Sequence, residues 1–181
     1  MNVKRFRRLC NISSFVLKGF TLFALLLTGY FMVQILTGNS NVWFNYEPPS
    51  FSIFTSASSM NLFNISDSEY RLAALIMTPF LITVYSYIMW KGAQLFKRLA
   101  DGETPFNSQF AKTLKLLSIV LIISDIAFPI LYSIILTTIY EDGHYFTIGL
   151  SSSFLIGIIL YVIAEIFYYG IELQHLADET V

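Results

Sequence analysis

Charged residues are scarce in this chain, and this scarcity is the first guide to its class. Asp, Glu, Lys and Arg make up 13% of the 181 residues, whereas soluble domains average about 25%. Hydrophobic residues reach 55%, and the mean hydropathy is +0.63. The formal net charge of -1 provides no basic field that would favour direct nucleic-acid binding. The composition predicts an integral membrane protein.

Groups that carry covalent or metal chemistry are equally sparse. Cys10 is the single cysteine, which excludes an intrachain disulfide and a cysteine-rich metal centre. No nucleophile motif, glycine-rich phosphate loop or zinc-ligand spacing is present. Glu172 and His175 have the i, i+3 spacing of di-iron bundles, but such sites need a second element of this kind and further glutamates. We therefore expect no enzyme activity, no metal and no cofactor.

Four apolar runs are long enough to cross a bilayer, whose core requires about 20 residues of helix. They predict spans over residues 15–36, 72–90, 116–138 and 148–169. The first run follows basic residues, as in a signal peptide, but its length of about 22 residues is too great and no cleavage site follows. The predicted fold is all-α: one membrane domain built as an antiparallel four-helix transmembrane bundle.

The remaining segments divide between the two faces of the membrane. Two outer loops are expected at 37–71 and 139–147, a cytoplasmic connector at 91–115 and a cytoplasmic tail at 170–181. Ten of the eleven basic residues then lie on one face, and only Arg71 lies on the other. These ten are Lys4, Arg5, Arg7, Arg8, Lys18, Lys91, Lys97, Arg98, Lys112 and Lys115. Because cytoplasmic segments are rich in Lys and Arg, both termini are predicted to be cytoplasmic.

The connector is expected to form a cytoplasmic helical hairpin. Gly102 is suited to the left-handed conformation that ends a helix, and Pro105 prevents direct continuation. Asn107 or Ser108 can then cap a helix that runs into the third span. The hairpin is either purely structural or a docking surface for a cytosolic protein. The docking candidates are Lys97, Arg98, Gly102, Pro105 and Phe106, with Glu172 in the tail.

Three ionisable residues are predicted within or near the membrane. Asp125 lies about 14 Å inside the third span at 1.5 Å per residue. It makes either a structural polar contact or an ion, proton or ligand site. Glu165 and Lys18 are at matching depths near the cytoplasmic ends of their spans. An ion pair between them is predicted; alternatively, Lys18 reaches the headgroups and Glu165 meets a hydroxyl or a water molecule.

Small residues recur every four positions before Glu165. Gly149, Ser153 and Gly157 are followed by Tyr161 on the same predicted helix face. Small residues at this spacing let two membrane helices approach closely. This face is therefore expected to point into the bundle.

The first outer loop is rich in aromatic residues. Trp and Tyr favour the bilayer interface, so this loop is expected either to lie against the headgroups or to receive a peptide or lipid. Its aromatic residues are Trp43, Phe44, Tyr46, Phe51, Phe54 and Phe63.

Two segments resemble a known family. The block LFKRLADGETPFN and the C-terminal AEIFYYGIELQHLADETV are similar to the small bacterial membrane proteins of domain of unknown function 2975. The resemblance covers residues 72–181 and rests on the turn at 102–106 and the Glu-Leu-Gln at 172–174. It implies a four-helix protein of the bacterial cytoplasmic membrane. Genes of this family often lie beside one for a small helix-turn-helix regulator, which implies membrane-linked gene control.

The leading functional hypothesis is a membrane regulatory or sensory protein that signals to a cytosolic partner, such as a small helix-turn-helix regulator. One alternative is an immunity-type protein that sequesters an extracellular antimicrobial peptide through the aromatic loop. Another is a small transporter that uses Asp125 and Glu165. The lipid bilayer is an expected partner in each case, and an oligomer is compatible with all three.

Overall fold

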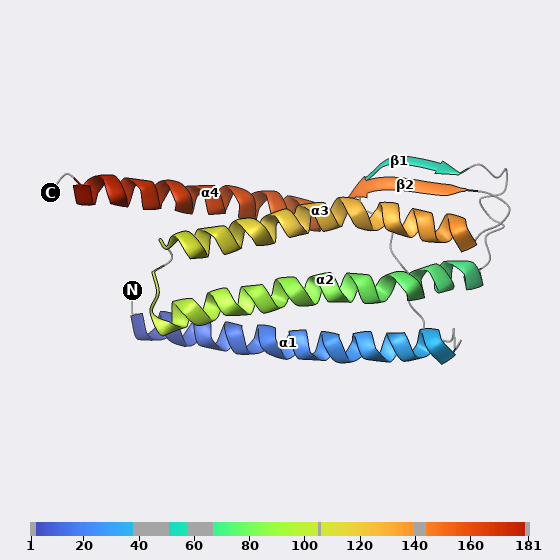
Figure 1. The fold of residues 1–181 in the computed structure, drawn as a ribbon, viewed down its shortest axis with the longest axis horizontal. Coiled ribbons are helices and arrows are strands. Elements are labelled where there is room, and N and C mark those ends of the chain that lie inside the picture. The colour runs from blue at the N-terminus through green and yellow to red at the C-terminus, as the bar shows by residue number, and fades with distance from the viewer. Residues whose placement is uncertain (1–2, 38–50, 58–66, 105, 140–143, 180–181) are drawn as a thin grey trace. The chain divides into compact units, whose positions relative to one another are not determined.

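The computed structural model contains four long helices and one small sheet (Figure 1). It describes residues 3–37, 51–57, 67–104, 106–139 and 144–179. The helices are α1 (Val3–Thr37), α2 (Asp67–Asp101), α3 (Ser108–Ile139) and α4 (Ser152–Glu179). The strands are β1 (Phe51–Ala57) and β2 (Tyr145–Leu150).

All four helices are long and apolar enough to cross a membrane. The shortest has 28 residues, whereas about 20 suffice for the bilayer core. Large apolar side chains are exposed along them, with Phe15 at 79% and Leu36 at 86% of full exposure. Several buried residues are small and polar, among them Ser14, Ser118 and Ser133. This distribution suits a chain surrounded by lipid and agrees with a multi-pass membrane protein.

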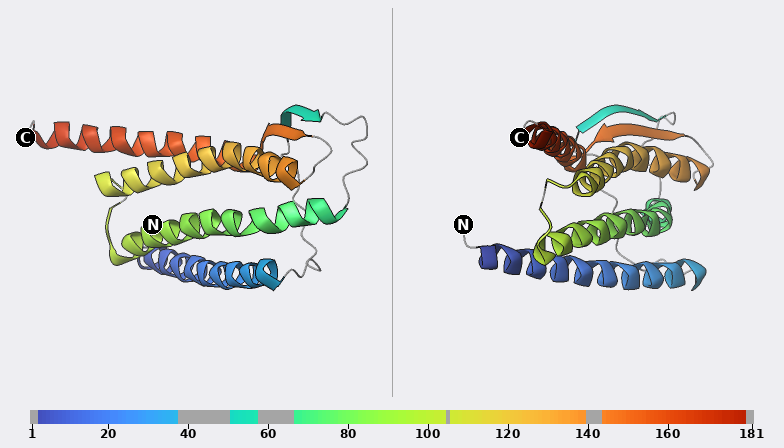
Figure 2. Two further views of the ribbon diagram at one scale, coloured as in Figure 1. Left: turned by 45° about the vertical axis from the view of Figure 1, so that its right-hand side comes forward. Right: turned by 60° about the vertical axis from the view of Figure 1, so that its left-hand side comes forward.

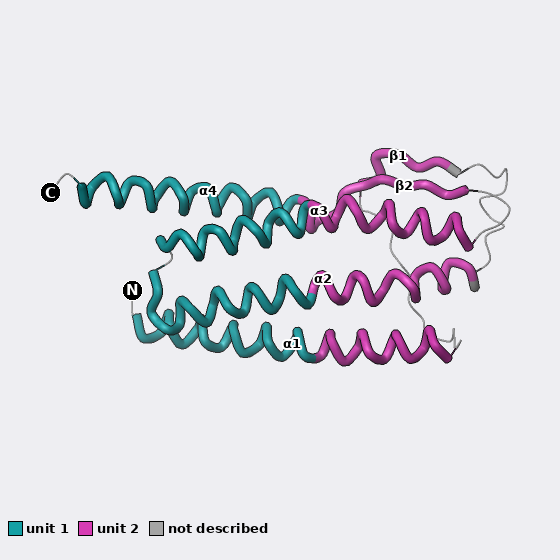
Figure 3. Tube along the Cα trace, in the orientation of Figure 1, with its two compact units in different colours: residues 1–22, 86–122, 155–181 teal, residues 23–85, 123–154 magenta. Residues whose placement is uncertain are grey.

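The chain divides into two compact units, and the helices run through both (Figure 3). Unit 1 contains residues 1–22, 86–122 and 155–181, and unit 2 contains residues 23–85 and 123–154. Ten of the eleven basic residues belong to unit 1 and only Arg71 to unit 2. The segregation of charge inferred from the sequence therefore coincides with a structural division.

In unit 1, the start of α1 is antiparallel to the end of α2. The hydroxyl of Ser14 donates to the carbonyl of Ala93 at 2.8 Å. Nearer the start of α1 and the end of α2, the Arg7 guanidinium lies against Gly102. A Cβ added to Gly102 would be 2.7 Å from Nη2 of Arg7. Ala93 is fully buried, so the absence of a large side chain lets the two backbones approach.

The α2–α3 turn confirms the predicted helix stop. Gly102 has φ +98°, in the left-handed region where a side chain is unfavourable. The amides of Gly102 and Glu103 donate to the carbonyls of Leu99 and Arg98, the pair of bonds that defines a Schellman motif. Asn107 then caps α3, since its Oδ1 accepts from the Gln109 amide at 3.0 Å. The connector is thus two helical extensions of α2 and α3. Pro105 lies outside the described residues.

Unit 2 contains the main hydrophobic cluster and the sheet. Buried side chains of α2 pack against buried side chains of α3; they are Ala73, Ala74 and Met77 with Phe128, Tyr132 and Leu136. Strands β1 and β2 lie side by side as an antiparallel pair (Figure 2). A bulge at Ile53 interrupts their register. The sheet corrects two predictions. Part of the segment 37–71 is a strand, and residues 148–150 are in β2, so α4 begins at Ser152 and not at 148.

Candidate functional site

Asp125 joins α3 to the beginning of α4. Its carboxylate is buried, at 8% exposure, and accepts a hydrogen bond from the Ser151 amide at 2.7 Å. The Ser151 hydroxyl donates to the other carboxylate oxygen. Ser151 immediately precedes α4, and its own oxygens accept from the amides of Ser153 and Phe154. A carboxylate at this position also meets the positive end of the α4 dipole. Of the two predicted roles for Asp125, this geometry supports the structural one.

Other polar side chains of α3 bind the edge of β2 that faces away from β1. The Ser133 hydroxyl accepts from the Thr147 amide at 3.0 Å and donates to the Pro129 carbonyl at 2.7 Å. Thr137 donates to the Tyr145 carbonyl at 2.9 Å and accepts from its amide at 3.1 Å. An open strand edge in an apolar medium would leave backbone groups unpaired. Thus α3 supplies the partners that a third strand would otherwise provide.

Glu165 is paired with Lys115, not with Lys18. The Lys115 Nζ is 2.5 Å from Glu165 Oε1 and lies over the rings of Tyr161 and Tyr168, at 5.1 and 5.7 Å from their centroids. The pair is partly exposed, at 34% and 45% for the two side chains. The predicted Lys18–Glu165 ion pair is therefore wrong. Equal depth was a poor guide because it does not determine which helices are neighbours: here α4 lies beside α3, and Lys18 is on α1.

Of the small residues predicted on one face of the fourth span, Gly157 and Ser153 are in α4, whereas Gly149 is in β2. A Cβ at Gly157 would be 2.7 Å from Cγ1 of Ile122 and 3.2 Å from the Ser118 carbonyl oxygen, so α3 and α4 are in close contact there. Gly149 is in β2, opposite Ser52 of β1. Ser153 is in the first turn of α4, where its hydroxyl is 3.3 Å from the Tyr85 hydroxyl.

The docking candidates of the connector all belong to unit 1. Lys97 is exposed and pairs with Asp101 at 3.1 Å within one helical turn. The ring of Phe106 packs edge-on against Phe167 of α4, with centroids 5.7 Å apart, although 49% of Phe106 is exposed. Phe110 makes a similar contact with Phe167 at 5.5 Å. The turn is therefore attached to α4 by aromatic packing. Arg98 has an Nη1 atom that is buried without a hydrogen-bond partner.

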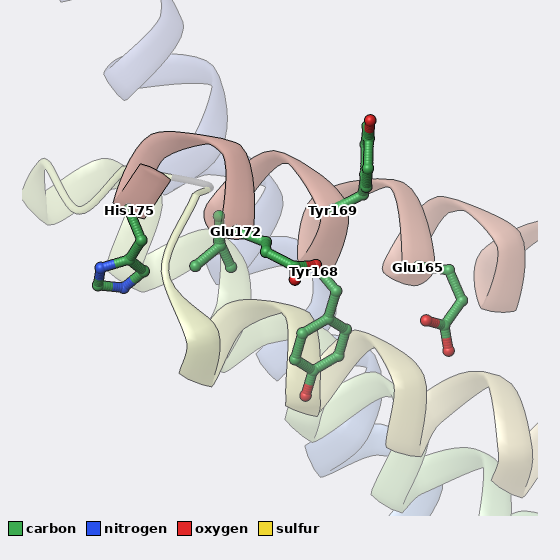
Figure 4. A pocket seen from close by; sticks show the side chains of 6 residues that line it. Glu165, Tyr168, Tyr169, Glu172 and His175 are labelled. Carbon is green, nitrogen blue, oxygen red and sulfur yellow. The ribbon is translucent and has the colours of Figure 1, made fainter. Parts of the chain in front are cut away.

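A shallow hollow of about 480 Å³ follows the C-terminal half of α4. Its lining comes entirely from this helix: Glu165, Tyr168, Tyr169, Ile171, Glu172 and His175. Figure 4 shows Tyr168 and Tyr169 pointing to opposite sides of α4. Glu172 thus belongs to an acidic and aromatic surface close to the Lys115–Glu165 pair.

The sequence does not identify the partners of Asp125 and Glu165. Ser151 lies inside the predicted span 148–169, although a run of three serines before an apolar segment is a typical helix start. Lys115 lies in the predicted connector, immediately before the third span, and no local pattern in the sequence identifies Glu165 as its partner.

Comparison with known proteins gives no relative for this chain: no family model, curated protein or solved structure matches it.

Proposed function

We propose that this chain is a regulatory protein of the bacterial cytoplasmic membrane that holds a cytosolic protein at its surface. The observation that carries the proposal is the C-terminal part of α4. Gly170 of α4 packs against the turn, since a Cβ there would be 2.9 Å from the Phe106 ring. The helix nevertheless continues to Glu179, with Leu173 and Leu176 exposed at 48% and 54%. We call residues 171–179 the tail helix.

The charge of the tail helix supports a basic partner. It contains Glu172, Asp178 and Glu179, and α4 has no basic residue in its last turn. The C-terminus of a helix carries partial negative charge, so acidic residues there are unfavourable unless a cation approaches. A basic protein surface would relieve this repulsion, while Leu173 and Leu176 would supply apolar contacts.

The orientation follows from the same division of charge. Unit 1 contains the start of α1, the α2–α3 turn and the tail helix, together with ten basic residues. We place this end of the helices in the cytoplasm, because cytoplasmic flanks of membrane spans are enriched in Lys and Arg. The tail helix then faces soluble proteins.

The partner class we favour is a small helix-turn-helix regulator, as the resemblance to domain of unknown function 2975 implies. Such regulators bind the phosphates of DNA through a basic surface. The acidic tail helix would compete for that surface and keep the regulator at the membrane. A change sensed by the membrane domain would then release it.

The test is site-specific photocrosslinking in living cells from residues 173 and 176. We expect an adduct between the membrane protein and a soluble protein, and we expect Glu172→Lys to abolish it. The matched control is residue 155, an equally apolar and exposed position on α4 (Leu155, 56% exposed) outside the tail helix. Adducts confined to lipid or to a second copy of the chain, together with unchanged transcription on deletion of the gene, would contradict the proposal.

One observation favours a second candidate function, the sequestration of an extracellular peptide. The apolar side chains of β1 are exposed, with Phe51 at 69%, Ile53 at 66% and Phe54 at 56%. Among the described residues, β1 pairs only with β2, so an extended peptide can add to its other edge. Unit 2 contains six acidic residues and one basic residue, which suits a cationic peptide. Replacing Ile53 with Pro would remove protection against such a peptide if this candidate is correct.

A further inference from the structure

Lys18 is in an unusual position for a lysine. It follows Phe15 by less than one turn in the apolar part of α1, and a lysine within a membrane span normally finds an anionic partner or reaches the headgroups. Among the described residues, Lys97–Asp101 and Lys115–Glu165 are ion pairs, and neither includes Lys18. Its exposed side chain is therefore open to an anion from outside the chain.

Lys18 lines a hollow of about 330 Å³ between α1 and α2. The two helices are held close beside it by the Ser14–Ala93 hydrogen bond and at Gly92, where an added Cβ would be 3.7 Å from Leu17 Cδ1. Five residues of α1 and one residue of α2 line the hollow. Because Ser14 both lines the hollow and bonds to Ala93, the hollow adjoins the close helix contact in unit 1.

The lining of this hollow combines cations, neutral polar groups and apolar groups. Helix α2 contributes Lys97, and α1 contributes Lys18, Asn11, Ser14, Ile12 and Phe15. Ile12 and Phe15 are exposed, at 52% and 79%.

Lys97 remains able to bind an additional anion. Its existing partner, Asp101, is one turn away on the same helix, and both side chains are about half exposed. Exposed pairs of this kind contribute little, so an anion between Lys97 and Lys18 can compete with Asp101.

We propose that this hollow binds the phosphate of an anionic phospholipid. Lys18 and Lys97 hold the phosphodiester from two helices, Asn11 provides an amide donor, and the acyl chains lie along Ile12 and Phe15. Basic pockets between membrane helices on the cytoplasmic side are typical sites for anionic headgroups. The exposed apolar rim favours a lipid over a free phosphate, because a soluble anion gains nothing from it.

The experiment measures lipid binding to the purified full-length protein in detergent by native mass spectrometry, with phosphatidylglycerol as the probe. Lys18→Gln and Lys97→Gln are each expected to weaken binding about fivefold, and the double variant about twenty-fivefold. Lys18→Arg with Lys97→Arg should retain binding. The control is Lys112→Gln, which removes the same charge from an exposed position on α3 and should have no effect.

Three results would overturn the proposal. The first is a double glutamine variant that binds phosphatidylglycerol as well as Lys112→Gln does. The second is equal affinity for phosphatidylcholine, which would show binding without selection for charge. The third is displacement of the lipid by inorganic phosphate when the phosphate concentration is similar to the lipid concentration, which would assign the site to a free anion. Circular dichroism of each variant shows whether the helices are intact, so a folding defect is recognised separately.

Discussion

Substitution of Asp125 tests the contact on which the start of α4 depends. In Asp125→Ala, the Ser151 amide and hydroxyl both lose their acceptor at a site that is only 8% exposed. A hydrogen bond to a charged group contributes about 1.5–3 kcal/mol, and the charge at a helix N-terminus adds about 0.3–1 kcal/mol. We therefore expect a loss of about 2–4 kcal/mol in the free energy of unfolding. Asp125→Asn retains one acceptor and should lose about half as much.

The assay is unfolding by sodium dodecyl sulfate in mixed micelles, followed by tryptophan fluorescence. Asp101→Ala is the matched control, because Asp101 is exposed and its pair with Lys97 should contribute less than about 0.5 kcal/mol. Ser151→Ala combined with Asp125→Ala should cost less than the sum of the single changes, since both remove one contact. A loss below that of the control, or strict additivity, would refute the assigned role of Asp125.

Three further predictions concern the other helix contacts. Gly157→Val should lower the free energy of unfolding by about 1–3 kcal/mol, because the valine side chain would overlap Ile122. Gly19→Val is the control and should be tolerated, since a Cβ at Gly19 meets nothing within 4 Å. Lys115→Met and Glu165→Gln should change the melting temperature non-additively when combined, because the two residues form an ion pair. Lys18→Met and Glu165→Gln should be additive, and the reverse pattern would support a Lys18–Glu165 ion pair instead. Ser133→Ala should increase hydrogen exchange at the Thr147 amide, and unchanged exchange would count against α3 as the partner of β2.

The sequence was a good guide to features that depend on local chemistry. Long apolar runs identify the four helices because a membrane helix needs only length and low polarity. Gly102 and Asn107 mark the α2–α3 turn because a left-handed residue and a side-chain cap satisfy backbone groups within a few residues. Such signals do not require knowledge of what lies elsewhere in the chain.

Features that join distant segments were missed or assigned incorrectly. Strands β1 and β2 are short, and their pairing joins Phe51 with Leu150, so neither strand is stable without the other or without α3. The partner of Glu165 depends on which helix lies beside α4, and matching depth pointed to Lys18 on α1, whereas Lys115 on α3 is the observed partner. Asp125 was recognised as important, but its partner Ser151 was concealed inside a predicted span.

The orientation of the helices is central to both proposals, and cysteine labelling measures it most directly. With Cys10 replaced by serine, single cysteines are introduced at three exposed positions. Glu103 and Glu179 are in unit 1, and His144 is in unit 2. A membrane-impermeant maleimide should label residue 144 in intact bacterial cells, and residues 103 and 179 only after permeabilisation. Labelling of residue 103 or 179 in intact cells would contradict the cytoplasmic placement of unit 1, and with it the proposed partner and the lipid site.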